Sequence, residues 1–362
     1  MIVAITLTVY AIALSAAVPR LLLRANWVDR APRLAIASWQ ALTVAVVGSL
    51  ALAGLSFAIP VAGLGGKGII DVLQACAMAL QQHYSTPTGA AVGIGGALLA
   101  CSVITRCFWG LASTGARMSR ERNAHRRVLD MVGRPDIDRD IVILDSTEAA
   151  VYCMPGIHRR TVVTTAALHA LTDEELIAVL AHERAHLTER HDLALAFSVA
   201  LSQAFHGLPP FQLAARETAR LVELRADDVA AARTHRLTVA AALLAVAAVP
   251  PRAVPAVALG AAGTGAAARV RRLLPPRQSV GRLPTCAAAV AIVLLLIAPG
   301  LALGWPAVTS ADHVLCPLAP ATSLSSSLSP TSGSAPAPAP ASASAAHAPC
   351  SVDSMDDFRF SS

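Results

Sequence analysis

Long apolar stretches alternate with polar ones along this chain. Four of them, residues 1–18, 34–61, 89–112 and 284–305, each approach or exceed the ~20 residues that a helix needs to cross a bilayer. One such stretch is also typical of a buried core helix, but four in one chain favour membrane spans. The pattern predicts a mainly α integral membrane protein, with three spans and short loops over residues 1–112 and a fourth span over 284–305.

A more polar region, residues 113–283, separates the third and fourth stretches and is long enough for one domain. Within it, "DIVILDSTEAAVYCMPGIHRRTVVTTAAL" alternates apolar and polar residues around a Pro-Gly pair, which predicts a short β-hairpin. Thr172 and Glu175 are spaced as a capping box, so a helix is expected to start there. Residues 193–211 are apolar enough for a buried core helix, or for a membrane hairpin or interfacial helix.

The helix predicted after Thr172 carries "VLAHERAHLTERHD", residues 179–192. At 3.6 residues per turn, His182 and His186 lie within about 40° of each other, so both imidazoles can reach one metal ion. Glu183 is placed as in H-E-x-x-H, where the carboxylate takes a proton from the attacking water. His191 is expected on the opposite face of the same helix and is not assigned as a ligand. The alternative is a charged, solvated helix face that carries two histidines by chance.

A second predicted helix, "RLVELRADDVAAARTH", places Glu223 and Asp227 four residues apart and therefore on one face. Glu223 is the candidate third ligand that a zinc hydrolase needs, and Asp227 is the candidate partner of a ligand histidine. Alone, Glu223 is typical of an exposed helix carboxylate, but the paired pattern favours a metal site. His235 is a candidate stabiliser of an oxyanion, with a surface histidine as the plainer interpretation.

Composition supports a membrane protein and argues against some other classes. The chain is 55% hydrophobic and 14% charged with a mean hydropathy of +0.57, which is too apolar for an ordinary soluble domain. Its net charge of +6 is carried by arginines that cluster beside the apolar stretches, so no direct nucleic-acid partner is expected. The seven cysteines include no C-x-x-C pair, which argues against a cysteine-based zinc site. Residues 306–362 are rich in Pro, Ala and Ser and are expected to form a disordered tail.

Together, "AHERAHLTERHD" and, 37 residues after its second histidine, "ELRADD" resemble the M56 family of membrane metallopeptidases, the BlaR1/MecR1-type gluzincins. The more distant M48 family, the HtpX/Ste24-type proteases, shares the paired motifs. The resemblance covers about residues 1–305, including the four-span plan and the hairpin. It implies that His182, His186 and Glu223 bind one Zn²⁺, that Glu183 is the catalytic base, and that Asp227 supports a ligand histidine.

The resemblance also implies a function for the region between spans 3 and 4. A gluzincin-type α+β zinc protease domain would cleave a cytoplasmic or membrane-proximal protein, with the strand near Tyr152 available to bind an extended substrate. Regulatory signalling is the expected role, with a BlaI-type transcriptional repressor as the candidate substrate. Two alternatives stay open: an M48-like protease that degrades misfolded membrane proteins, and a non-catalytic zinc-binding membrane receptor.

The chain departs from the antibiotic-sensing receptors after the fourth span. Their penicillin-binding domain requires a Ser-x-x-Lys nucleophile and a further lysine in Lys-Thr-Gly. The single lysine of this chain is Lys67, which precedes the third span. No binding of β-lactams is therefore expected.

Arginines that flank the predicted spans indicate their orientation, because positive residues in short loops favour the cytoplasm. They gather after the first span and at both ends of the polar domain: Arg20, Arg24, Arg30, Arg33, Arg117, Arg120, Arg122, Arg126, Arg127, Arg269, Arg271, Arg272, Arg277 and Arg282. The expected arrangement is a multi-pass protein of the plasma membrane, with the zinc domain in the cytoplasm and with the N-terminus and the tail outside. Cys76, Cys316 and Cys350 would then face the exterior, where a disulfide among them is an open question.

Overall fold

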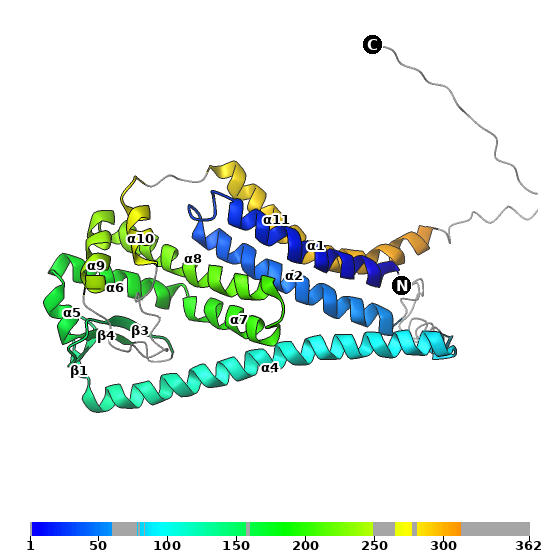
Figure 1. Ribbon diagram of the computed structural model, residues 1–362, viewed down its shortest axis with the longest axis horizontal. Coiled ribbons are helices and arrows are strands. Elements are labelled where there is room, and N and C mark those ends of the chain that lie inside the picture. The colour runs from blue at the N-terminus through cyan, green and yellow to red at the C-terminus, as the bar shows by residue number, and fades with distance from the viewer. Residues whose placement is uncertain are drawn as a thin grey trace, which may run out of the picture. The chain divides into compact units, whose positions relative to one another are not determined.

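The computed structural model describes residues 2–59, 78, 80–82, 84–156, 160–248, 265–276 and 281–312. Lys67, Cys76, Cys316 and Cys350 lie outside these residues, as does most of the predicted tail. Four described helices are long and apolar enough to cross a membrane: α1 (Ile2–Arg24), α2 (Pro32–Ala58), α4 (Pro87–Val132) and α11 (Arg282–Asp312) (Figure 1). They coincide with the predicted stretches, and α11 continues past residue 305 to Asp312. The prediction of a mainly helical chain with four apolar helices is confirmed.

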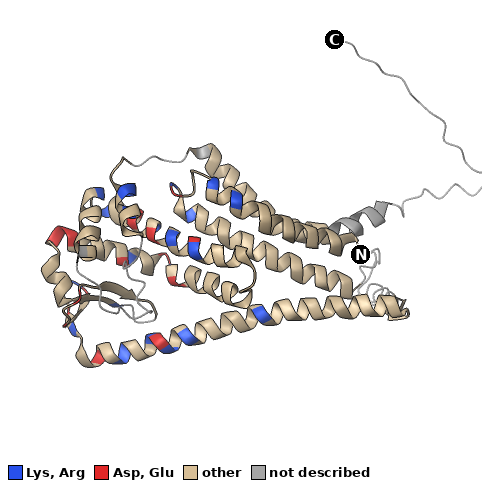
Figure 2. Cartoon of the chain, viewed as in Figure 1, with Lys and Arg blue, Asp and Glu red and all other residues tan. Residues whose placement is uncertain are grey.

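The third of these helices, α4, is a single element of 46 residues. It begins where Thr86 Oγ1 accepts a hydrogen bond from the Gly89 amide at 3.2 Å, and it ends before Gly133. Its first half is apolar, and most of its charged residues, including the arginines that follow the third predicted span, lie in the second half (Figure 2). The helix runs through residues 112 and 113 without interruption. The predicted boundary between the spans and the polar domain therefore falls inside a continuous element.

A four-stranded sheet follows α4, in the order β1-β2-β4-β3. Its strands are β1 (Arg134–Asp136), β2 (Ile141–Leu144), β3 (Val151–Met154) and β4 (Arg160–Thr164). β3 and β4 are antiparallel, with Val151 opposite Val163, so the predicted hairpin is confirmed, and β2 adds parallel to β4. One face packs against Leu129 near the end of α4, and the other packs against Leu176 and Leu180. β3 is the last strand in this order, so it forms one edge of the sheet.

The described chain has six further helices: α5 (Thr165–Ala170), α6 (Asp173–Thr188), α7 (His191–Ala204), α8 (Pro209–Arg233), α9 (Arg236–Ala248) and α10 (Ala266–Leu273). The predicted capping box opens α6, because Thr172 Oγ1 accepts from the Glu175 amide at 3.3 Å and Glu175 Oε2 accepts from the Thr172 amide at 2.9 Å. α6 ends at Thr188, since Arg190 adopts a left-handed conformation with φ of 54°. His191 begins the next helix, so the prediction that it continues α6 on the opposite face is wrong.

Helices α7 and α8 form a hairpin that packs against the span helices (Figure 1). Leu201, Phe205 and Phe211 share one buried core with Trp39 and Leu42 of α2. The stretch 193–211 is thus part of a core that the polar domain shares with the spans.

The hairpin of α7 and α8 also packs against α4. Arg106, inside the apolar half of α4, donates from Nη1 to the Ala204 carbonyl at 3.0 Å. That carbonyl belongs to the last turn of α7, where C=O groups have no partner within the helix. Gly110 permits the close approach, because a Cβ at this position would lie 2.8 Å from the Ala200 carbonyl oxygen. A single arginine in an apolar span is therefore explained by the helix end that it caps.

The loop between α1 and α2 contacts the polar domain. Asp29 Oδ1 lies 2.7 Å from Arg220 Nη1 on α8. The Asp29 carbonyl accepts a hydrogen bond from Arg272 Nη2 on α10 at 2.7 Å. This loop and the polar domain therefore lie at the same end of the spans.

Candidate metal centre

Two helices bring the three predicted metal ligands together. His182 and His186 stand one turn apart on α6, and Glu223 reaches them from α8. The Nε2 atoms of the two histidines are 3.1 Å apart, and each lies 3.5 Å from a carboxylate oxygen of Glu223. Both histidines are buried, whereas the Glu223 side chain is 23% exposed. Among the described residues, this is the group of three that could hold a metal ion.

The separations suit a tetrahedral ion. With metal–ligand bonds of ~2.1 Å, the corners of a tetrahedron lie roughly 3.4 Å apart. The ligand atoms here are separated by 3.1 and 3.5 Å. Two imidazole nitrogens that face each other with a carboxylate beside them form a donor set that fits Zn²⁺. Three protein ligands leave the fourth tetrahedral position for water or substrate.

The two ligand histidines differ in protonation. Burial lowers the pKa of His186 to about 3, so its imidazole is neutral near pH 7. Burial also acts to lower the pKa of His182, but hydrogen bonds with Asp227 and Glu223 outweigh it and raise this pKa to about 9. Because an imidazole binds a metal only when its ligating nitrogen is deprotonated, His182 would release a proton on metal binding.

Asp227 lies behind His182, as the sequence analysis proposed, with its Oδ1 3.1 Å from His182 Nδ1. Its second partner was not anticipated. Arg269 of α10 binds both carboxylate oxygens of Asp227, with Nη2 to Oδ1 at 2.6 Å and Nε to Oδ2 at 2.8 Å. Burial acts to raise the pKa of Asp227, but the hydrogen bonds from Arg269 and His182 bring it down to about 2. Asp227 is therefore an anion that fixes the tautomer and orientation of His182.

Arg269 also reaches the third ligand, since its Nη1 lies 2.9 Å from Glu223 Oε2. In the sequence, Arg269 and Arg272 are typical of arginines near a span. The structure shows that both are ion-pair partners of α8, with Arg272 binding the two oxygens of Asp228 at 2.8 and 2.9 Å. Arg269 and Leu273 stand four residues apart on α10, and both are buried. A buried arginine requires a buried anion nearby.

Glu183, the predicted base, lies on α6, and its side chain is buried against the edge strand β3. It is 2% exposed, and its Oε2 has no hydrogen-bond partner among the described residues. Cys153 of β3 lies against this carboxylate, a contact that the sequence did not signal. Burial raises the pKa of Glu183 to about 7, with His182 opposing and the charge of Glu223 adding to the shift. A carboxylate with a pKa near neutrality can both take up and release a proton.

His191 lies beside the ligand histidines and not away from them. Its Nδ1 is 3.1 Å from His186 Nδ1, and its Nε2 lies 3.5 Å from Glu189 Oε2. Burial lowers the pKa of His191, so the ring is neutral and can accept the Nδ1–H of His186. His191 is therefore placed to orient His186, in the way that Asp227 orients His182, and it is not one of the three grouped ligands.

The two remaining predicted site residues lie outside this group. Tyr152 on β3 is buried, and its hydroxyl lies 2.6 Å from His125 Nε2 of α4, while burial raises its pKa to about 12. Side chains alternate along a strand, so Tyr152 faces α4 while Cys153 faces Glu183. His235 is exposed between α8 and α9, where its Nδ1 accepts from the Leu237 amide at 3.3 Å. Its role at an oxyanion stays a prediction.

Comparison with known proteins gives one family. The family model of Peptidase family M48 matches residues 118–218, from the second half of α4 into α8. The stretch includes His182, Glu183 and His186 and ends before Glu223. No curated protein and no solved structure matches the chain. The matched family is the one to which the sequence analysis gave the more distant resemblance, and the M56 assignment is not confirmed. The M48 match, together with the four apolar helices, supports a membrane-associated metallopeptidase, that is, a hydrolase.

Proposed function

We propose that this chain is a membrane-bound zinc metalloendopeptidase that binds one Zn²⁺. The observation that carries the proposal is the grouping of His182, His186 and Glu223, with Glu183 buried beside them. Hydrolytic zinc enzymes use three protein ligands and a base, whereas structural zinc sites usually have four protein ligands and need no base. The buried carboxylate of Glu183 therefore argues against a non-catalytic zinc receptor.

The proposed chemistry assigns a task to each buried group. When bound, zinc supplies a Lewis acid that polarises a peptide carbonyl and lowers the pKa of a water molecule. Glu183 accepts the proton of the attacking water and passes it to the leaving amine, for which a pKa of about 7 is well matched. Asp227 and Arg269 hold His182 in place. His235 is retained as a candidate donor to the oxyanion, on sequence grounds alone.

The proposed substrate is a protein at the membrane. α4 joins the span to the sheet without a break, and the edge strand β3 offers backbone groups with which an extended substrate can pair. Two roles fit this arrangement. One is a signalling protease that cuts a dedicated regulator, such as a BlaI-type repressor, and the other is a quality-control protease that degrades many misfolded membrane proteins. The M48 match fits the second role equally well.

The substitution Glu183→Gln tests the enzyme assignment. An amide keeps the size and the hydrogen bonding of the side chain but cannot take a proton, so we expect the variant to keep zinc and to lose proteolysis by about 10²-fold or more. Metal analysis of the purified protein and an unbiased comparison of cleaved peptides in cells measure the two effects. Equal cleavage by both forms would refute the role of Glu183. A single cleaved protein indicates signalling, and many misfolded ones indicate quality control.

We also propose that the polar domain faces the cytoplasm. Asp29 contacts α8 and α10, which supports a location of the first loop and the polar domain on the same side of the membrane. Both carry clustered arginines, and such clusters favour the cytoplasmic side. Cys153 is a poor reporter of orientation, because it is buried. Ser119 is exposed on the second half of α4. In intact cells, a membrane-impermeant thiol reagent should leave Ser119→Cys unlabelled above the wild-type background until the membrane is permeabilised, and labelling without permeabilisation would place the domain outside.

A further inference from the structure

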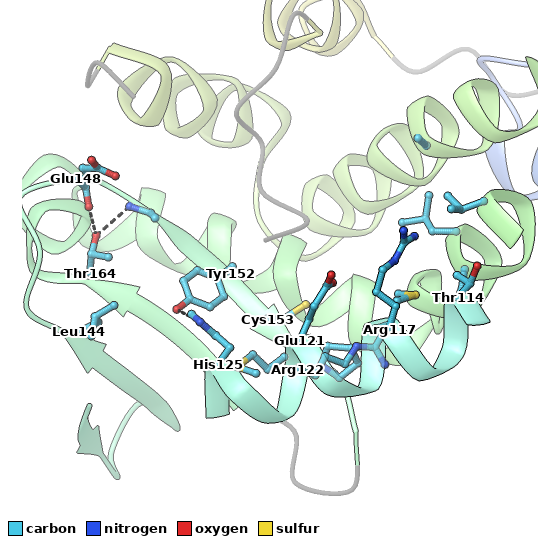
Figure 3. Close-up of a pocket in the computed structure, with 18 of the residues that line it drawn as sticks. Thr114, Arg117, Glu121, Arg122, His125, Leu144, Glu148, Tyr152, Cys153 and Thr164 are labelled. Atoms are coloured by element: carbon cyan, nitrogen blue, oxygen red, sulfur yellow. Dashed lines mark hydrogen bonds between the residues drawn. The ribbon is translucent and has the colours of Figure 1, made fainter. Parts of the chain in front are cut away.

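A cavity of about 630 Å³ lies between the second half of α4, the edge strand β3 and α7 (Figure 3). We refer to it as the α4–β3 cavity. Tyr152, Cys153 and Met154 line it from the strand, and Leu195 and Val199 line it from α7. Cys153 also lies against the carboxylate of Glu183. Cys153 therefore connects the wall of the cavity with the proposed catalytic base.

The strand side of the cavity is an open edge. β3 pairs with β4 on one side only, and no described strand lies on its other side. The outward backbone groups of an edge strand are free to pair with an added chain. A polypeptide that binds in the α4–β3 cavity would therefore be extended, with its side chains alternating toward and away from α4.

The charged groups on the helix side of the cavity differ in whether they already have a partner. Two of its polar groups are already engaged: Arg122 pairs with the buried Asp192 at 3.4 Å, and His125 binds Tyr152. Arg117 and Glu121 are exposed and form no ion pair or hydrogen bond with another residue of the described chain.

Arg117 and Glu121 both rise from α4 into the cavity (Figure 3). Glu148, the other acidic lining residue, precedes β3, and its carboxylate points away from α4 (Figure 3). The charges available to a bound chain on the helix side are therefore one cation and one anion.

The spacing of the two free charges matches an extended chain. Residues four apart on a helix are separated by about 6 Å along its axis and share a face. Residues two apart on a strand are separated by roughly 6.6 Å and share a face. An extended chain that runs along α4 in the cavity would thus bring successive α4-facing side chains opposite Arg117 and Glu121.

We propose that Arg117 and Glu121 determine specificity, by selecting substrate segments in which an acidic and a basic residue stand two positions apart. The basic side chain pairs with Glu121 and the acidic one with Arg117. This inference rests on the proposed protease function and adds the class of peptide that the site accepts. Both residues act on substrate binding and have no part in proton transfer.

The test uses full-length protein in detergent with zinc and fluorescent peptides that carry acid-x-base, base-x-acid, base-x-base or acid-x-acid pairs. Binding is measured on the Glu183→Gln form, so that the measurement does not depend on turnover. Cleavage is measured on the wild type. We expect one of the two mixed-charge orders, the one set by the direction in which the peptide runs along β3, to bind about fivefold more tightly than the like-charge peptides, as for a solvent-accessible ion pair. Glu121→Lys should shift the preference to acid-x-acid peptides, and Arg117→Glu should shift it to base-x-base peptides.

Arg127→Glu is the matched control, because Arg127 is exposed on α4 but does not line the cavity. It changes the charge of the helix by the same amount as Arg117→Glu and should leave the preference unchanged. Charge preferences that do not respond to Glu121→Lys or Arg117→Glu, or that respond equally to Arg127→Glu, would overturn the inference. Mixed-charge binding without cleavage by the wild type would instead overturn the proposed protease function and the assignment of these peptides as substrates, while charge selection by Arg117 and Glu121 would hold.

Discussion

Removing the guanidinium of Arg269 should destabilise the protein in a way that zinc can correct. Arg269 holds the fully buried Asp227 through hydrogen bonds of 2.6 and 2.8 Å and lies 2.9 Å from Glu223. In Arg269→Gln, the buried Asp227 and the partly exposed Glu223 lose this cation and keep the imidazole of His182 beside them. Breaking a buried ion pair by removing one partner costs about 3–5 kcal/mol, because the remaining charge is left uncompensated. Because the raised pKa of His182 keeps its imidazole protonated beside both carboxylates, we expect a loss at the lower end of that range, about 3 kcal/mol, when zinc is withheld.

Zinc should reduce the loss, since the bound ion would place positive charge beside the same two carboxylates. The matched control is Arg272→Gln on the same helix. Arg272 binds Asp228 at 2.8 and 2.9 Å, but Asp228 contacts none of the three ligands, so its loss should be independent of zinc. Unfolding of both variants in detergent, with chelator and with zinc, gives the four free-energy differences. Equal losses for Arg269→Gln with and without zinc would refute this reasoning.

Two further predictions concern ligands. Glu223→Ala should lose most of the bound metal, whereas Asp227→Ala should weaken zinc binding roughly 10- to 100-fold, as removal of an outer-shell partner does, and both are measured by competition with a chromophoric chelator. Loss of zinc in His191→Ala with retention in Glu223→Ala would contradict the ligand set. A fluorescent penicillin should not label the protein covalently, because the required lysine chemistry is missing from the sequence, and a labelled band on a denaturing gel would contradict this.

The parts of the site that could be predicted from sequence depend on local spacing. The capping box at Thr172, the facing pair His182 and His186, and the shared face of Glu223 and Asp227 all follow from helix geometry over four residues or fewer. The continuity of α4 was not visible in the sequence for a related reason. Composition changes near residue 112, but a helix can carry an apolar half and a charged half without a break.

What was missed depends on contacts between segments far apart in the chain. Arg269 stands 42 residues after Asp227, and "RVRR" is equally typical of arginines that flank a span. His191 was assigned to the wrong face because α6 ends through a left-handed Arg190, a conformation that costs about 1–2 kcal/mol for a residue other than glycine and has no sequence marker here. Tertiary packing of α7 against α4 and α8 compensates for this cost, and packing of this kind is not visible in local patterns.

The continuous helix α4 sets the height of the proposed cutting site above the bilayer. Thirteen residues separate Ala112, where the apolar half ends, from His125, which binds the β3 side chain of Tyr152. At a rise of 1.5 Å per residue this is about 20 Å of rigid helix. An extended chain covers that distance in roughly six residues. If the proposed protease acts on membrane proteins and α4 stands upright in the bilayer, at least that much unfolded chain would have to follow the span of a substrate before it could be cut.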